Sequence, residues 1–284
     1  MLKKALQYEW QKLFHTVLFK VAILIGLIIA AVHFTEVAVY VREYWGKVGS
    51  DVVHPNGLSS ISLKFTALGC DGGTISCRIF PLLLPILAAL PYGISLCKER
   101  KSGYQLQAIS RVGKRKYLIA KGLVGFASGF IVIFIAMLTD TMLCACICPL
   151  SKIDVASMMS FAEQGTFFSE WFYTHPILFL FASILLSSVW GGISAIVALA
   201  SEILVQNRVL IMIGPFLLFN VLGFLTEIYF KLFDNSAYII NPIQMFRAFS
   251  MGGNPAWYLM IWQLGFLGLA IILYYRGGMK RENL

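Results

Sequence analysis

Nucleotide hydrolysis would require a phosphate-binding loop somewhere in this 284-residue sequence. Such a loop needs glycines whose backbone amides surround the phosphates, followed by Lys and then Ser or Thr. Gly113 and Lys114 are followed by Arg115 instead, and no glycine precedes them at the required spacing. An H-E-x-x-H motif and a Ser/His/Asp set are also missing from the sequence. We therefore expect no catalytic residue and no cofactor bound by this chain.

The six cysteines could support metal binding or disulfide formation. Cys144 and Cys148 share a helix face, but we find no His or carboxylate joining them at ligand spacing, so we predict no metal site. Cys70 and Cys77 fall in the first external loop of the topology argued below, where an oxidising compartment permits a bridge. They are the disulfide candidates, with two free thiols as the alternative.

The internal stretch 98–117 is basic and carries a short helical pattern. Gly103 and Gly113 bracket residues 104–112, which are long enough for a two-turn helix. The residues of this helix separate onto two predicted faces, with Tyr104, Gln107 and Arg111 on one and Leu106, Ile109 and Ala108 on the other. A short helix ringed by basic residues suits docking against a soluble partner, but the same pattern also fits a solvated basic loop.

The elements around this stretch are long apolar segments. Hydrophobic residues make up 58% of the sequence and charged residues 13%, too few charges for the surface of a soluble domain of this size. Six segments are long enough to cross a bilayer, at about 16–35, 79–97, 118–148, 177–201, 209–226 and 257–275. Backbone groups in lipid must pair internally, so these segments should be helices. The predicted fold class is an all-α integral membrane protein with six transmembrane helices.

The basic residues predict the orientation of these helices. Most of the 23 Lys and Arg residues fall before the first segment, between the second and third, between the fourth and fifth, and after the last. Cytoplasmic loops are enriched in Lys and Arg, so both termini should be cytoplasmic. The net charge of +9 is thereby explained as a topology signal, and we expect no nucleic-acid partner.

Two flanking segments have distinct patterns. Residues 1–15 are amphipathic, which predicts a helix lying in the membrane interface or, alternatively, a simple continuation of the first span. Residues 227–256 should form an external re-entrant segment, because their Ile, Phe and Met residues can enter the interface as short helices and Pro242 interrupts them.

Charged residues are rare inside the predicted spans. We expect Lys20 and Lys121 near cytoplasmic ends, where their side chains can snorkel to the interface. His33, Glu36 and Asp140 fall near outer ends. Intramembrane charges mark proton and ion pathways in secondary transporters. Their absence from the middle of the spans argues against proton or sodium coupling, so the energy source should lie elsewhere.

The stretch 98–104, the Ala108-Ile109-Ser110 step and the basic turn at 115–117 resemble the second cytoplasmic segment of ABC type-2 permeases. That segment has an acidic residue, a Gly, a short coupling helix and a basic turn into span three; Tyr104 stands where Thr is commoner. The resemblance implies one transmembrane domain over 1–284. It also implies a homodimer or heterodimer of permeases with two ATP-binding cassette ATPase subunits, which carry ATP and Mg²⁺. The implied coupling residues are Glu99, Gly103, Tyr104, Leu106, Gln107, Ile109 and Arg111.

The resemblance also suggests a translocation path and a substrate class. Spans two and five of such permeases are thought to face the path, and the corresponding candidates here, with one from span six, are Pro85, Pro91, Asn220 and Gln263. Kinked packing is the alternative role for the prolines. We expect a bacterial cell-membrane exporter of an amphipathic or hydrophobic substrate, first a peptide toxin or antimicrobial peptide, for secretion or self-immunity. The alternatives are an exporter of lipid-linked glycan, drug or ion, and a non-transporting scaffold or sensor.

Overall fold

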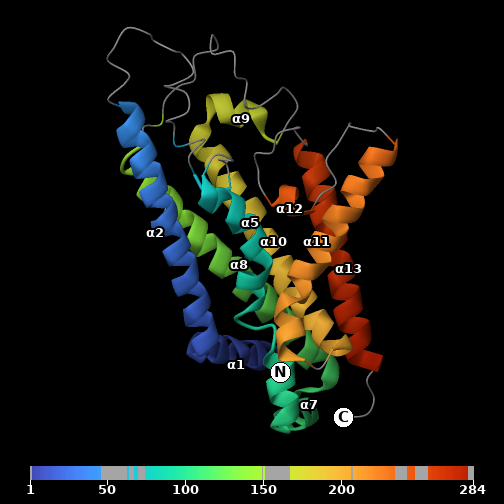
Figure 1. Cartoon of the computed structure of the whole chain (residues 1–284). Helices are drawn as coiled ribbons and strands as arrows, with labels where there is room; N and C mark the ends of the chain where they lie inside the picture. Colours follow the sequence, from blue (N-terminus) through green and yellow to red (C-terminus); the bar gives the residue numbers. More distant parts are fainter. Residues whose placement is uncertain are drawn as a thin grey trace.

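The computed structural model describes residues 2–45, 63, 67–69, 74–148, 150, 167–205, 207–233, 242–246 and 255–280. Within these residues the regular elements are all helices, and no strand occurs. Figure 1 shows them as an elongated bundle. In chain order they are α1 Leu2–His15, α2 Val17–Trp45, α5 Ile75–Ala89, α6 Ser95–Lys101, α7 Tyr104–Val112, α8 Lys114–Ala145, α9 Ser169–Thr174, α10 Pro176–Leu204, α11 Arg208–Phe233, α12 Pro242–Met245 and α13 Ala256–Lys280.

Five helices in the described part of the chain, α2, α8, α10, α11 and α13, are long and apolar enough to cross a membrane. They cover five of the six predicted spans. Their outer faces carry exposed large side chains such as Leu24, Leu217 and Leu264, which water would not favour but lipid accepts. The predicted all-helical class is confirmed, and length and composition indicate a multi-pass membrane protein.

The remaining predicted span, 79–97, is not one continuous helix. α5 has 15 residues and ends at Ala89, a turn follows over 90–94, and α6 begins at Ser95. Pro91 lacks the amide hydrogen that would continue the ladder, and its ring crowds the carbonyl four residues earlier. At 1.5 Å per residue, α5 is about 22 Å long, less than the ~30 Å hydrocarbon core. The prolines therefore break this segment into two helices, and a sixth membrane-crossing helix is not confirmed.

α8 and α10 form the centre of the bundle. The most apolar parts of these helices are 50% and 67% buried, against 17% in α13. Glycines let the two approach closely: a Cβ on Gly129 would lie 2.5 Å from the carbonyl oxygen of Gly191, and one on Gly192 would lie 2.4 Å from the Phe126 ring. Small residues at such contacts are the usual basis of helix packing in membranes.

The predicted external segment 227–256 begins later than expected, because α11 continues to Phe233. Residues 234–241 and 247–254 lie outside the described residues. Between them, α12 and Phe246 turn back to the bundle, where Phe246 is 1% exposed and packs 5.1 Å from the Trp190 ring on α10. The Ser187 hydroxyl donates to the Phe246 carbonyl at 2.6 Å. This part of the segment is therefore anchored to α10.

Candidate functional site

The short helix α7 stands away from the bundle at the end where α1 lies (Figure 1). None of its residues is buried. Gly103 (φ 71°) precedes it and Gly113 (φ 86°) follows it, both with positive φ, a conformation that glycine adopts without strain. The chain can thus turn sharply into and out of α7. The helix has the bounds that the glycines predicted.

The faces of α7 differ in part from the prediction. Leu106 is 56% exposed, while Ile109 is half-buried against the hydrophobic core. The two apolar residues therefore do not form one shared docking face. Gln107 and Arg111 are also exposed. The accessible surface of α7 consists of one leucine with polar and basic neighbours.

The inner side of α7 rests on α1. The rings of Tyr8 and Tyr104 stack with centroids 5.8 Å apart, and the Lys12 ammonium lies 5.5 Å from the Tyr104 ring centroid. Burial, followed by the hydrogen-bonding neighbour Tyr8, raises the pKa of Tyr104 above its usual value. An aromatic and cation–π contact therefore links α7 to the N-terminal helix.

Beneath this contact lies a group of buried charges around Glu99 on α6, which is 3% exposed. Lys121 on α8 places its Nζ 2.7 Å from Glu99 Oε1, and Lys12 on α1 forms an ion pair with the same oxygen. The Tyr117 hydroxyl donates to Glu99 Oε2. One carboxylate thus joins α1, α6 and α8.

A second carboxylate, Glu9 on α1, extends the same group. The Tyr92 hydroxyl donates to Glu9 Oε2, and Lys121 Nζ lies 3.5 Å from that oxygen. Lys121 is 0% exposed and also lies 5.3 Å and 5.2 Å from the ring centroids of Tyr92 and Tyr117. We call Glu9, Lys12, Glu99 and Lys121, with Tyr92 and Tyr117, the charge network.

The charge network as defined has two carboxylates and two ammonium groups, and the charge of a third buried carboxylate, Glu202 on α10, also acts on Lys121. Buried ions persist in a protein when they are paired and hydrogen-bonded, and removing one partner leaves an uncompensated charge. Burial, followed by the charge of Lys121, lowers the pKa of Lys12 from 10.5 to about 8. The network therefore holds the N-terminal helix and the segment before α7 against the long helix α8.

One sequence-based interpretation changes here, that of Lys121, and the alternative of a solvated basic loop does not hold at Glu99. Lys121 does not snorkel to the interface, because its side chain is fully buried and paired. Glu99 is no solvated surface charge, since it is buried beneath α1. Among the predicted coupling residues, Glu99 therefore lies below the surface, whereas Gly103, Leu106, Gln107 and Arg111 are exposed.

The N-terminal helix is separate from the first long helix. Thr16 separates the two helices, and its amide donates to the Leu13 carbonyl at 3.0 Å. Figure 1 shows α1 lying across the lower end of α2. A simple continuation of the span is thus excluded. Leu13 and Glu9 on α1 are buried against the protein, while Lys3 is exposed.

Within the described residues, the side-chain amides of the translocation-path candidates bond to backbone carbonyls and not to one another. Gln263 on α13 donates to Leu186 O on α10 at 2.8 Å, and Asn220 donates to Phe216 O in its own helix at 2.8 Å. Pro85 and Pro91 are buried. In this single chain both amides are engaged by backbone carbonyls, and their role in a path stays a prediction.

The predicted disulfide and the metal prediction fare differently. Cys70 lies outside the described residues, so the bridge stays a prediction, while Cys77 is buried beside the His33 ring. The absence of a metal site stays a prediction, but the structure brings two side chains that were not expected, His33 and Asp140, next to Cys144. The spacing of Asp140 and Cys144, four residues apart on one helix, was a visible signal. Nothing in the sequence pointed to His33.

Comparison with protein-family models and with curated proteins finds no match to this chain.

Proposed function

We propose that this chain is the membrane-spanning permease subunit of an ATP-driven exporter of the ABC type-2 kind. The observation that carries the proposal is the placement of α7, an exposed short helix at one end of an apolar bundle, seated on the buried charge network. A movement of α7 would be transmitted to α1 through the contact of Tyr104 with Tyr8. It would be transmitted to α8 through the segment that contains Glu99. A helix that couples a soluble subunit to the membrane helices requires such contacts.

The charge around α7 supports a soluble acidic partner. Arg111 on the helix and Arg115 and Lys116 just after it are exposed, as are Lys98 and Lys101 before it. Complementary charge favours the encounter and orientation of two partners. On this proposal the partner is an ATP-binding cassette ATPase that carries ATP and Mg²⁺, so ATP hydrolysis takes place on a separate chain.

The proposed arrangement in the membrane follows the basic residues. The end with α7, α1 and the end of α13 is cytoplasmic, and α5, the 90–94 turn and α6 together complete a sixth crossing. Two copies, identical or different, form the permease. The substrate is an amphipathic or hydrophobic molecule, first of all a peptide toxin or antimicrobial peptide, because such a molecule itself partitions into the membrane interface beside the apolar spans.

The test is recovery of the ATPase with the chain. Full-length protein purified from its native membranes in mild detergent should bring down an ATP-binding subunit, and the complex should hydrolyse ATP. Leu106→Asp and Arg111→Glu, both at exposed positions on α7, should each reduce recovery of that subunit at least tenfold. Arg208→Glu, an equal charge change at an exposed position at the start of α11, is the control for general loss of basic charge.

Two results would overturn the proposal. Recovery of no ATP-binding subunit by the folded wild-type chain would favour a non-transporting scaffold or sensor. ATP hydrolysis by the purified chain alone would contradict the proposal that a separate subunit hydrolyses ATP. The substrate class can then be tested by adding amphipathic helical peptides, a lipid panel or cationic drugs to the reconstituted complex. The class that stimulates ATP turnover is the substrate class.

A further inference from the structure

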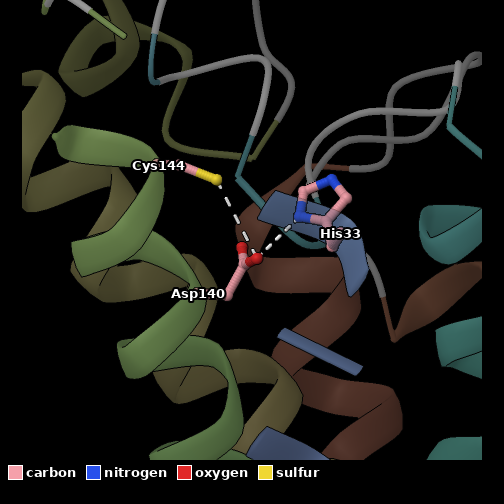
Figure 2. A group of neighbouring side chains, drawn as sticks. All are labelled: His33, Asp140 and Cys144. Atoms are coloured by element: carbon pink, nitrogen blue, oxygen red, sulfur yellow. Dashed lines mark hydrogen bonds and ion pairs between the residues drawn. The ribbon is translucent and has the colours of Figure 1, made fainter. Parts of the chain in front are cut away.

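A compact group of metal-ligating side chains lies between α2 and α8. His33 on α2 and Asp140 and Cys144 on α8 are all 0% exposed. His33 Nδ1 lies 2.6 Å from Asp140 Oδ1, and Cys144 Sγ lies 3.9 Å from the same oxygen (Figure 2). The three ligand atoms lie within 4.8 Å of one another. They therefore converge on one small volume.

Two further groups hold these side chains in place. The Leu68 amide donates to Asp140 Oδ2 at 2.7 Å, which leaves Oδ1 directed at His33 and Cys144. Cys77 Sγ lies 3.5 Å from Nε2 of His33, on the ring nitrogen that faces away from Asp140. Metal-binding His and carboxylate groups commonly have such outer partners, which fix ring tautomer and carboxylate orientation.

We propose that His33 Nδ1, Asp140 Oδ1 and Cys144 Sγ bind a Zn²⁺ ion, with the fourth position open to water or an incoming ligand. One nitrogen, one oxygen and one sulfur donor suit Zn²⁺, whereas Mg²⁺ and Ca²⁺ prefer oxygen alone. Tetrahedral Zn²⁺ with bonds of about 2.0–2.3 Å places its donors ~3.3–3.6 Å apart. On binding, the distance from His33 Nδ1 to Asp140 Oδ1 must lengthen and the distance from Cys144 Sγ to Asp140 Oδ1 must shorten, each by less than ~1 Å.

The electrostatic balance favours this exchange. With both ring nitrogens protonated, His33 donates to Asp140 and Cys77, and the group of imidazolium, carboxylate and Cys144 thiol is neutral. Zn²⁺ displaces one proton from His33 and one from the Cys144 thiol, and both protons pass to water. The product, Zn²⁺ with one carboxylate, one thiolate and a neutral imidazole, is again neutral. A buried site can therefore load the ion without acquiring net charge.

The ion would join the second half of α2 to the C-terminal end of α8, the opposite end of α8 from α7. This inference does not depend on the proposed exporter function. A His33–Asp140 ion pair alone would account for two of the residues but would need neither thiol. The two arrangements therefore differ in whether Cys144 becomes a metal-bound thiolate, which a direct measurement can decide.

The test uses purified full-length protein in detergent, stripped of metal by a chelator and titrated with Zn²⁺ against a chromogenic competitor. We expect one Zn²⁺ per chain. Co²⁺ in its place should give tetrahedral visible bands and a thiolate-to-metal charge-transfer band. Cys144→Ser should remove that band, and Asp140→Asn should weaken Zn²⁺ binding more than tenfold. Cys77→Ser, an outer partner, should weaken it about 10–100-fold.

Cys146→Ser is the matched control, because Cys146 is exposed on the same stretch of chain and offers a thiol two residues away. It should leave stoichiometry and spectrum unchanged. No stoichiometric Zn²⁺ binding by folded wild-type protein, or a cobalt–thiolate band that persists in Cys144→Ser, would overturn the proposal. The test does not depend on the folding of Cys144→Ser. If the wild-type protein with Co²⁺ shows no thiolate-to-metal charge-transfer band, thiolate ligation is contradicted.

Discussion

Nζ of Lys121 on α8 lies 2.7 Å from Oε1 of Glu99 on α6, with 0% and 4% of the two side chains exposed. The same ammonium lies 3.5 Å from Glu9 on α1, so one lysine joins α8 both to the nearby helix α6 and to the N-terminal helix, which is distant in sequence. Buried ion pairs are weak evidence for added stability but strong evidence for mutual dependence. The first prediction follows from that dependence.

Replacing Lys121 with Met should strongly destabilise the protein, because Glu9 and Glu99 then remain buried without their shared cation. We expect a loss of about 3–5 kcal/mol, measured by thermal or denaturant unfolding in detergent. Lys20→Met, at an exposed position on α2, is the control and should change stability by less than about 0.5 kcal/mol. Adding Glu99→Gln to Lys121→Met should recover part of the loss. Equal effects of Lys121→Met and Lys20→Met would contradict the network.

The pKa of Lys12 predicts a pH dependence of stability. Its folded-state value is lowered to about 8 from 10.5 in the unfolded chain. Between these values the unfolded chain binds more protons, so the contribution of Lys12 to the free energy of unfolding becomes more favourable as pH rises from 8 to 10. Lys12→Met removes the group. The stability difference, wild type minus Lys12→Met, should therefore increase over this range, and a flat or falling difference would exclude the lowered pKa.

Gly113 should resist substitution for backbone reasons alone. Its φ of 86° and ψ of 142° are unfavourable for any residue with a Cβ, yet nothing lies within 4 Å of a Cβ placed there. Gly113→Ala should destabilise the α7–α8 junction by about 1–3 kcal/mol and speed hydrogen exchange of α7 amides. Gly265→Ala, inside α13 with equally open space, should instead be neutral or stabilising by up to about 1 kcal/mol. Similar effects at both sites would contradict the argument.

The proposed orientation can be tested by labelling at the two ends of the bundle. Ser110 on α7 and Glu170 on α9 are both exposed, and Figure 1 places their helices at opposite ends. Over the wild-type background, an impermeant maleimide should label Glu170→Cys in intact cells and Ser110→Cys only after permeabilisation. The reverse pattern would invert the topology and place α7 where no ATPase can reach it.

Local sequence patterns predicted much of the helical architecture. The long apolar runs correspond to α2, α8, α10, α11 and α13, and the two glycines marked the ends of α7. Patterns failed where one residue acts against its neighbours. Near Pro91 the apolar stretch 79–97 breaks, because α5 ends at Ala89 and a turn follows over 90–94. Hydropathy averages over such positions and does not register them.

The candidate sites depended on contacts that no local pattern encodes. Glu9, Glu99 and Lys121 each resemble ordinary charges at the margin of an apolar segment, and only the crossing of α1 over α6 and α8 buries them together. His33 likewise meets Asp140 across 107 residues of chain. Pairing of this kind is set by how helix faces rotate toward one another.

The sequence by itself determined that the chain is helical and apolar enough to cross a membrane several times, because segment length and composition are local properties that the bilayer reads directly. It also determined where α7 begins and ends, because glycine alone adopts the required backbone conformations freely. Only the tertiary structure decided which polar side chains meet. A buried charge is tolerated only when a partner from another helix reaches it, and that depends on packing geometry over the whole bundle.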